Sequence, residues 1–496
     1  MSGSLNVTVA LSHPNMPADT EPEEPFHALL TIEPTAVLSS DDRPPLNIVL
    51  VVDSSATMHH LLLSDVERDY WMSLAVSRDE LERGRADGRD AVYWTGQTLA
   101  EMESSARKPM AIAVEAIKSV LSTLKPTDRV SVLAFADKVH TVFSDRDWAT
   151  LPTQCLMQLD LLRDQRLSVD IGTGTFLADA LQQAGDILSQ NSLDGGINRL
   201  IVVSDGIVQD IDSTLASVAG VQDRGFSITT IGLGLDFDEE FLIRIADNSR
   251  GEYHHAPEVA EIIDCLTTEF ANLKSTSVTD LYIAVRGLNK CMIQDIFMVR
   301  PAINLFDEIY TEDDWMRARI GDVSSNDPSG ILVQYIPSKV EEGFQLFAEA
   351  QLTWTNPGAP AHLSKGYHKI TMAGDFTNNA VALQETNPAV VDLVDRFNVF
   401  KLEREAQRAQ DKGDLATAKE KYGAATRQLS KLGETELAQD MQAQIFNLGS
   451  VSADTTRIKR IKNTTRKLGV SSSSSHTDTA SDGEVVQSGA GQAESL

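Results

Sequence analysis

Two apolar runs that each lead into an aspartate limit the possible folds of this chain more than any other feature. Residues 46–52, LNIVLVV, are apolar apart from Asn47, rich in β-branched side chains and followed by Asp53. A second run, RLIVVS at 199–204, leads into Asp205. Such runs are typical of strands that are buried on both faces of a parallel sheet. We therefore expect an α/β sheet with helices on both of its faces.

The pattern between residues 46 and 273 supports this fold. Met110, Ile117 and Leu124 belong to one apolar helical stripe, and the strand-like sequence RVSVLAF follows at 129–135. Helical and strand-like segments continue to alternate at short intervals, which favours βαβ units and a parallel sheet. We predict a doubly wound, mainly parallel, Rossmann-like α/β domain over 46–273.

The segments on both sides of this domain have a β pattern. Strand-like runs occur at 5–11 and 26–34, and residues 276–375 alternate between apolar and polar positions with little helical pattern. This texture is typical of an antiparallel sandwich. The early strands are too few to form a core alone, so we expect residues 1–45 to join the β-sandwich of 276–375. The α/β domain would then be inserted in that sandwich.

A helical region is predicted after the sandwich. Residues 387–448 have the pattern of a helical hairpin joined at Gly413, with a third helix behind it. The last segment, 449–496, contains the basic sequence RIKRIKNTTRKLG and ends in a Ser/Thr-rich tail that we expect to be disordered. Basic residues ahead of Thr464 and Thr465 suit recognition by a kinase, and the alternative is a basic segment that docks on an acidic body.

Composition excludes several classes of function and location. The formal net charge of −29 argues against a nucleic-acid partner, because such proteins need a basic face. No apolar run approaches the roughly 20 residues that span a bilayer, and the amino terminus lacks the pattern of a secretory signal. The cysteines are scattered and fit neither a disulfide framework nor a zinc site. They are Cys155, Cys265 and Cys291. A cytoplasmic location is the simplest expectation.

Oxygen-bearing side chains follow the predicted strands or lie in adjoining loops. Asp53, Ser55 and Thr57 come after the first strand, Thr175 lies in GTGTFLADAL, and Asp205 ends the run at 199–204. Ligands of α/β sheets bind at the carboxyl ends of the strands. Carboxylate and hydroxyl oxygens suit a hard cation such as Mg²⁺. The alternative is that Asp53 and Ser55 merely cap a following helix.

These segments resemble the metal-ion-dependent adhesion site, or MIDAS, of the von Willebrand factor type A (VWA) domain. DSSATM at 53–58 resembles the family's Asp-x-Ser-x-Ser motif, with Thr57 in place of the last serine. The second motif is a threonine in a Gly-rich turn, where the spacing to FLADAL favours Thr175 over Thr173. The third is an aspartate after a buried strand, as in IVVSDG. The resemblance implies one Mg²⁺, or Mn²⁺, held by Asp53, Ser55, Thr57, Thr175 and Asp205.

The same resemblance implies a function. In this family one coordination position of the metal stays open for an Asp or Glu carboxylate of a protein partner. The chain would then be an intracellular, metal-dependent interaction module or scaffold and not an enzyme. Its order of segments resembles bacterial multidomain members of the family, for which AAA+ ATPases or Ser/Thr kinase signalling proteins are expected partners. A purely structural scaffold with an empty site is the alternative.

Other chemistry fits less well. A haloacid-dehalogenase-like phosphotransferase also places an aspartate after a buried strand, but its second acid would fall at Ser55. The adjacent histidine pairs, 59 and 60 and 254 and 255, do not share a helix face and are expected at the surface or at an edge.

One departure from the family pattern is large. The first helix normally follows the first motif closely, whereas residues 59–106 intervene here. This insertion should emerge beside the predicted metal site. Its aromatic side chains could contact a partner or form a small core of their own. They are Tyr70, Trp71, Tyr93 and Trp94.

Overall fold

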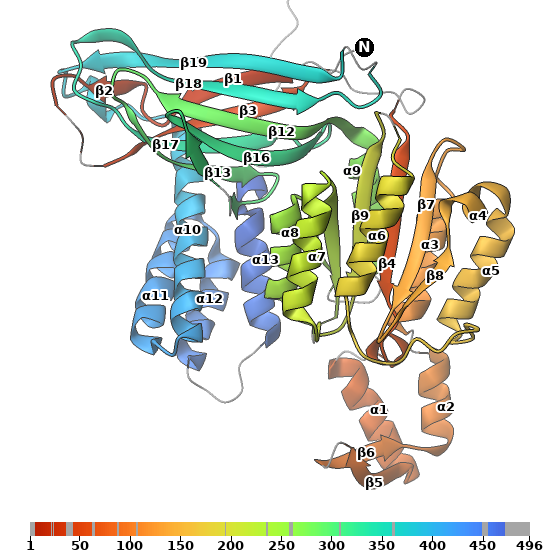
Figure 1. Cartoon of the computed structure of the whole chain (residues 1–496). Coiled ribbons are helices and arrows are strands. Elements are labelled where there is room, and N and C mark those ends of the chain that lie inside the picture. Colours follow the sequence, from red (N-terminus) through yellow and green to blue (C-terminus); the bar gives the residue numbers. More distant parts are fainter. Residues whose placement is uncertain are drawn as a thin grey trace, which may run out of the picture.

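The computed structural model (Figure 1) contains the three predicted units. It describes residues 5–471 except 21, 23, 36–42, 62–64, 87–88, 106–107, 194, 235–236, 257–260, 307–308, 360–362 and 449–454. An α/β domain carries a β-sandwich at one end, and a helical region lies beside both (Figure 1). The predicted fold class is confirmed. The tail predicted to be disordered lies outside the described residues beyond Ser471.

The central sheet of the α/β domain has six strands. In spatial order they are β11 (Tyr253–Ala256), β10 (Ser227–Leu233), β9 (Ile197–Ser204), β4 (Leu46–Asp53), β7 (Arg129–Phe135) and β8 (Val139–Phe143). All neighbours are parallel except β7 and β8, which are antiparallel. β4 is central and every one of its residues is buried, which explains its continuous apolar sequence.

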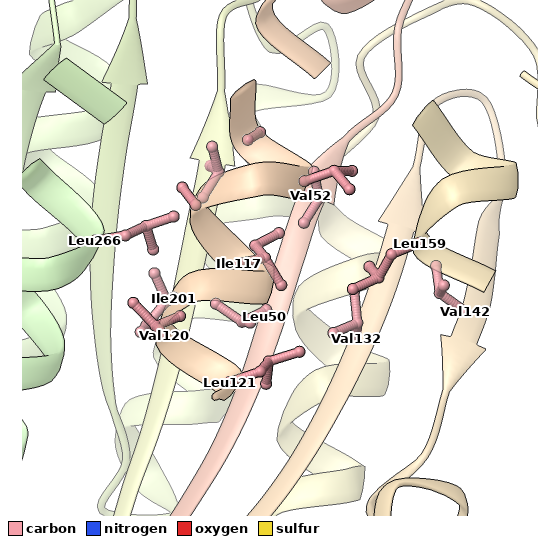
Figure 2. Packing of buried hydrophobic residues seen from close by; sticks show 14 of the residues in the cluster. Leu50, Val52, Ile117, Val120, Leu121, Val132, Val142, Leu159, Ile201 and Leu266 are labelled. Atoms are coloured by element: carbon pink, nitrogen blue, oxygen red, sulfur yellow. The ribbon is translucent and has the colours of Figure 1, made fainter. Parts of the chain in front are cut away.

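Helices cover both faces of this sheet. One face is covered by α3 (Pro109–Leu121), α4 (Asp145–Thr150), α5 (Pro152–Arg163) and α9 (Glu261–Ser275). The other face is covered by α6 (Ala178–Gln190), α7 (Ile211–Asp223) and α8 (Glu239–Ser249). Leu50 and Val52 of β4 meet Ile117 of α3 and Leu266 of α9 in the first core (Figure 2). Each fully buried side chain of this size contributes roughly 1.5–3 kcal/mol.

The sandwich is built from segments on both sides of the α/β domain. Its first sheet contains β1 (Leu5–Leu11), β3 (Phe26–Pro34), β17 (Ser329–Ile336), β13 (Met292–Arg300) and β14 (Asn304–Leu305), in that order. The second contains β15 (Tyr310–Glu312), β16 (Trp315–Ser324), β12 (Thr276–Gly287), β18 (Gly343–Thr355), β19 (Lys365–Thr377) and β2 (Asn15–Pro17). β3 pairs antiparallel with β17, with Leu30 opposite Ile331. The α/β domain is thus inserted between β3 and β12.

The helical region begins after the short 3₁₀ turn η3 (Ala382–Gln384) and is longer than predicted. Its helices are α10 (Pro388–Asp411), α11 (Leu415–Leu432), α12 (Thr435–Asn447) and α13 (Thr455–Ser471). Gly413 has a φ of +77° and makes the turn between α10 and α11, as a glycine can without strain. The predicted hairpin is followed by the third helix that the sequence predicts, α12, and by one more helix, α13.

The basic segment at the end of the described chain is helix α13, which packs against the acidic body. Lys459 Nζ donates to the carbonyl oxygen of Phe237 at 2.8 Å, and Arg466 pairs with Asp247 of α8. Thr464 is exposed, whereas Thr465 is fully buried and donates to the carbonyl oxygen of Ile461. A kinase therefore has access to Thr464 but not to Thr465 while α13 is docked.

The insertion is a small subdomain that projects from the end of β4 (Figure 1). A 3₁₀ turn, η1 (Thr57–His59), leads into α1 (Asp65–Arg78), the hairpin β5 (Leu81–Ala86) and β6 (Arg89–Trp94), and α2 (Gly96–Ser105). Ala75 and Met102 are buried, while the side chains of Tyr70 and Tyr93 are 59% and 44% exposed. The tyrosines therefore point outward, whereas Trp71 and Trp94 are half-buried.

Candidate metal centre

Asp53 is fixed at the carboxyl end of β4 by neighbours on two sides. Its Oδ1 accepts a hydrogen bond from Ser55 N at 2.8 Å, and its Oδ2 accepts one from Ser204 Oγ of β9 at 2.5 Å. Its side chain is fully buried. The alternative that Asp53 and Ser55 cap a following helix is wrong for η1. The residue that precedes η1 is Ala56, and no side chain caps this turn. Asp53 instead organises the loop between β4 and η1.

The two hydroxyl groups of this loop connect it to Asp205. Ser55 Oγ lies 3.0 Å from Thr57 Oγ1. Thr57 Oγ1 donates to Asp205 Oδ1 at 2.8 Å, although the two residues are far apart in the sequence. This contact forms because β4 and β9 are parallel neighbours whose carboxyl ends lie at the same edge of the sheet.

Thr175 completes the group from a third loop. Its carbonyl oxygen accepts from Gln209 N at 2.9 Å, which ties the threonine loop to the loop after β9. A Cβ placed on Gly206 would lie 2.8 Å from Thr175 Oγ1 and 3.3 Å from Asp53 Oδ2. The glycine therefore keeps open a small space that both oxygen atoms border. Thr173 is exposed and contributes a carbonyl oxygen, which accepts from Ala56 N.

The electrostatics of the site favour a cation. Burial raises the pKa of the Asp53 carboxyl, and the hydrogen bonds from Ser204 and Ser55 lower it in part. Asp205 is also buried, so two carboxyl groups lie near three hydroxyl groups. All five donors are oxygen atoms, which suits Mg²⁺ or Mn²⁺. The residues present thus fit the predicted metal.

Sequence reasoning missed the residues that hold this group in place. Ser204 anchors Asp53, and its position directly before Asp205 is the one signal that could have indicated it. Asp210 accepts hydrogen bonds from the backbone N–H groups of Leu177 and Ala178, at 3.0 Å each, at the start of α6. Asp137 Oδ1 accepts from Gly174 N at 2.8 Å. Both aspartates fix the loop that carries Thr175.

The expectation of surface or edge positions for the paired histidines is wrong for His59. Its ring is buried, and Nε2 lies 3.2 Å from Ser54 Oγ. Burial lowers the pKa of His59 to about 4, with help from Lys108 and His60, so the ring is neutral at pH 7. The reason is that η1 turns inward beside Met58, which is part of the core.

His254 lies on the edge strand β11 and takes part in a second charged cluster. Its Nε2 is 3.3 Å from Glu269 Oε2 and 3.5 Å from Glu252 Oε2. Burial lowers the pKa of His254, but the two carboxylates outweigh this and raise it. Arg199 Nε lies 3.9 Å from Glu269, and Arg199 Nη2 donates to Asp322 of β16 at 2.8 Å. Two cationic side chains thus lie among three carboxyl groups, and the bond between Arg199 and Asp322 joins the α/β domain to the sandwich.

The fold defines the class of protein: the chain contains a von Willebrand factor type A domain, and the candidate site lies at the carboxyl edge of its sheet. Residues 103–267 match the family model of that description, and residues 388–471 match the model described as Sll0103-like, C-terminal alpha-helical domain. The second match includes all of α10 to α13. The first match begins after most of the insertion, so it includes Thr175 and Asp205 but not the loop at 53–57.

Similar proteins place the chain more closely. The uncharacterized protein YfbK of Escherichia coli is 24% identical over 189 residues, which are 37% of this chain and 31% of that protein. Inter-alpha-trypsin inhibitor heavy chain H2 of Mus musculus is 30% identical over 148 residues, or 28% of this chain and 15% of that protein. The chain thus spans less than a third of the length of these relatives.

Solved structures show the same fold. A von Willebrand factor type A protein from Catenulispora acidiphila superposes with a TM-score of 0.67 at 15% identity, covering 94% of this chain and 97% of that one. The human COPII-coat protein Sec24c superposes with a TM-score of 0.52 at 7% identity, covering 93% and 75%. The first comparison extends over sandwich, α/β domain and helices together, so the whole arrangement recurs.

Among the helices that the structure describes, none combines the length and the apolar character needed to cross a membrane.

Proposed function

We propose that this chain is a metal-dependent protein-interaction module or scaffold, not an enzyme, that binds an Asp or Glu side chain of a protein partner. The main support is that Asp53 and Thr175 border the space at Gly206, while Asp205, the residue directly before that glycine, accepts a hydrogen bond from Thr57. Mg²⁺, or Mn²⁺, would be held there by the oxygen atoms of these three residues with Ser55 and Thr57. When bound, the cation would supply a Lewis-acidic position for a carboxylate of the partner.

The side chains of this site suit capture of an acidic group. Asp53 and Asp205 supply two negative charges, and the three hydroxyl donors are neutral, so an added carboxylate meets limited repulsion. Ser204 and Ser55 keep the Asp53 carboxylate in one orientation. A fixed carboxylate need not be ordered again when the partner binds, which lowers the entropic cost of capture.

Apolar side chains at the rim support a protein partner. Phe176 follows Thr175 directly and is 40% exposed, and Ile207 follows Gly206 and is 61% exposed. They flank the proposed metal position on two loops. A partner that offers a carboxylate beside an apolar side chain would satisfy both features, because buried apolar contacts supply most of the energy of an interface.

The proposed setting is a reducing, cytoplasmic compartment with a signalling or assembly partner. Cys155, Cys265 and Cys291 are free thiols, and burial raises the pKa of all three, so they are unreactive. AAA+ ATPases and Ser/Thr kinase signalling proteins are the proposed partner classes. Both rest on the resemblance described above.

Calorimetric titration with Mg²⁺ tests the site. Asp53→Ala and Asp205→Ala should each reduce Mg²⁺ affinity by more than about 100-fold, because each removes a charged ligand. Ser55→Ala removes a neutral donor and should weaken binding by roughly tenfold. The matched control is Asp223→Ala at the exposed end of α7, which should leave the affinity unchanged. Unchanged Mg²⁺ affinity in both site variants would show that the metal assignment is wrong.

Partner capture tests the mechanism separately. Immobilised full chain is exposed to a lysate of its source cells with Mg²⁺ or with EDTA, and the captured proteins are identified. Proteins that bind wild type in Mg²⁺ but neither wild type in EDTA nor Asp53→Ala support the proposal. Loss of metal binding with unchanged capture would favour a structural scaffold whose site plays no part in recognition. Thermal melting confirms that each variant is folded.

A further inference from the structure

A cavity of about 430 Å³ lies where the α/β domain, the sandwich and the helical region meet. Its walls come from α8, β14, α10 and α13. Of these, α10 and α13 lie side by side (Figure 1). None of its lining residues belongs to the candidate metal centre. Its volume lies within the range of roughly 300–1,000 Å³ that is typical of small-molecule sites.

Basic side chains are concentrated in this cavity, although the chain as a whole carries a net charge of −29. The basic residues are Arg244, Arg404, Arg408, Lys462 and Arg466, and the acidic ones are Glu240, Asp247, Glu403 and Asp411. Arg466 pairs with Asp247, and Lys462 Nζ lies 3.7 Å from Glu240. Arg404 and Arg408 form no ion pair with any residue that the structure describes. They lie four residues apart on α10, so they share one face of that helix.

Glu403 is the second unusual feature of the cavity. Its side chain is 2% exposed, and its carboxyl group accepts no hydrogen bond within the described part of the chain. A hydroxyl or amine group of a ligand in the cavity would supply the missing donor.

The remaining wall is apolar. Phe400 is buried on α10, and Ile243 of α8 and Leu305 of β14 complete this side. Phe400 and Ile243 are already buried, whereas Leu305 is half-buried, and an inorganic ion would leave Leu305 in contact with water. A ligand with an organic body would cover Leu305 and gain the free energy of apolar burial.

We propose that this cavity binds a small organic anion. Its phosphate or carboxylate group would be held by Arg404 and Arg408, and its hydroxyl or amine group would pair with Glu403. Guanidinium groups suit this task because they bind oxyanions through two parallel hydrogen bonds. A bound ligand would contact α8, α10 and α13 together and would fasten the helical region to the α/β domain.

Calorimetry on the full chain tests the proposal with four probes: 4-aminophenyl phosphate, 4-aminobenzoate, inorganic phosphate and benzyl alcohol. At least one aromatic anion should bind more tightly than inorganic phosphate, and benzyl alcohol should not bind. The better of the two aromatic anions identifies the head group. If neither aromatic anion binds at millimolar concentration, the proposal is wrong.

Variants locate the binding. Arg404→Gln and Arg408→Gln should each weaken binding of the better anion by about tenfold or more, because each removes a charge-assisted contact. Both residues reach solvent, so folding should persist, and thermal melting checks this. Lys412→Gln, an exposed charge just beyond the end of α10, is the matched control and should bind as wild type does. Equal affinity in both arginine variants and wild type would place the anion elsewhere and overturn the proposal.

Glu403→Gln separates the role of the carboxyl group. With phenyl phosphate, which lacks an amine, Glu403→Gln and wild type should bind equally. With 4-aminophenyl phosphate, wild type should bind several-fold more tightly than the variant. The absence of any preference for the amine in wild type would remove Glu403 from the proposed site.

Discussion

At the residue scale, each of the two candidate sites contains a buried carboxyl group. Asp53 and Glu403 are both buried, and burial raises the pKa of each because it disfavours the charged form. Asp53 receives hydrogen bonds from two serines, whereas Glu403 receives none within the described residues. We propose that the first binds a cation, and the second provides a test of how burial affects stability.

Glu403 provides a prediction about pH and stability. Burial raises its pKa to about 7, well above that of an unfolded glutamate, so the folded chain binds this proton more tightly. The stability from the protonated carboxyl is therefore present at low pH and is lost as the pH rises through about 7. The effect of Glu403→Gln on the free energy of unfolding, relative to wild type, should be more favourable at pH 8 than at pH 5 by about 2 kcal/mol. Urea unfolding at both values measures this difference.

The control for that experiment is Glu420→Gln, an exposed glutamate on α11. It should change the free energy of unfolding equally at both pH values, because an exposed carboxyl has nearly the same pKa in the folded and unfolded chain. An effect of Glu403→Gln that is the same at pH 5 and pH 8 would contradict the assignment.

At the level of elements, α13 shows how one helix is fixed by a few contacts. Arg466 forms two hydrogen bonds with Asp247 of α8, at 3.0 and 2.9 Å, and both side chains are buried. Removal of one partner leaves a buried charge without compensation. Arg466→Ala should therefore lower the free energy of unfolding by about 3–5 kcal/mol, as measured by urea unfolding.

A double variant and a surface control make this prediction specific. Arg466→Met with Asp247→Leu removes both charges and should cost less than Arg466→Ala alone. Arg460 lies on the same helix, is 64% exposed and pairs with Asp440, so Arg460→Ala should cost less than about 1 kcal/mol. If Arg460→Ala and Arg466→Ala cost the same, the buried pair does not fix α13.

At the scale of the whole molecule, the sandwich depends on strands that lie before and after the α/β domain in the sequence. β3 lies between β1 and β17, and its Leu30 and Ile32 belong to the core shared with Ile331 and Val333. The α/β domain therefore lies within the sequence of a sandwich that closes only after residue 276. This arrangement makes the first strands essential although they contribute no residue to either candidate site.

Deletion of residues 1–34 tests this dependence. The truncated chain loses β1, β2 and β3, which exposes the edge of β17 and its apolar side chains, and we expect it to aggregate. Deletion of residues 1–12 alone removes the edge strand β1 but leaves β3 in place, so it should be tolerated better. Size-exclusion chromatography with light scattering measures both. A monomeric, cooperatively melting chain without residues 1–34 would contradict the prediction.

The sequence by itself determined the elements and indicated the residues of the candidate site. The apolar run of β4 predicted a central buried strand, Gly413 predicted a turn between helices, and the residues from Asp53 to Asp205 were found from local motifs. These features could be predicted because strand and helix periodicity and turn chemistry act over a few neighbouring residues.

Only the tertiary structure decided which distant side chains meet. Ser204 binds Asp53, His59 is buried, α13 docks on α8, and Glu403 faces a cavity formed by three units. Apart from the position of Ser204 directly before Asp205, no local pattern marks these residues, because serine, histidine, arginine and glutamate have the same periodicity whether they are exposed or buried. Their burial, and with it their pKa and their partners, depends on packing between segments that are far apart in the sequence.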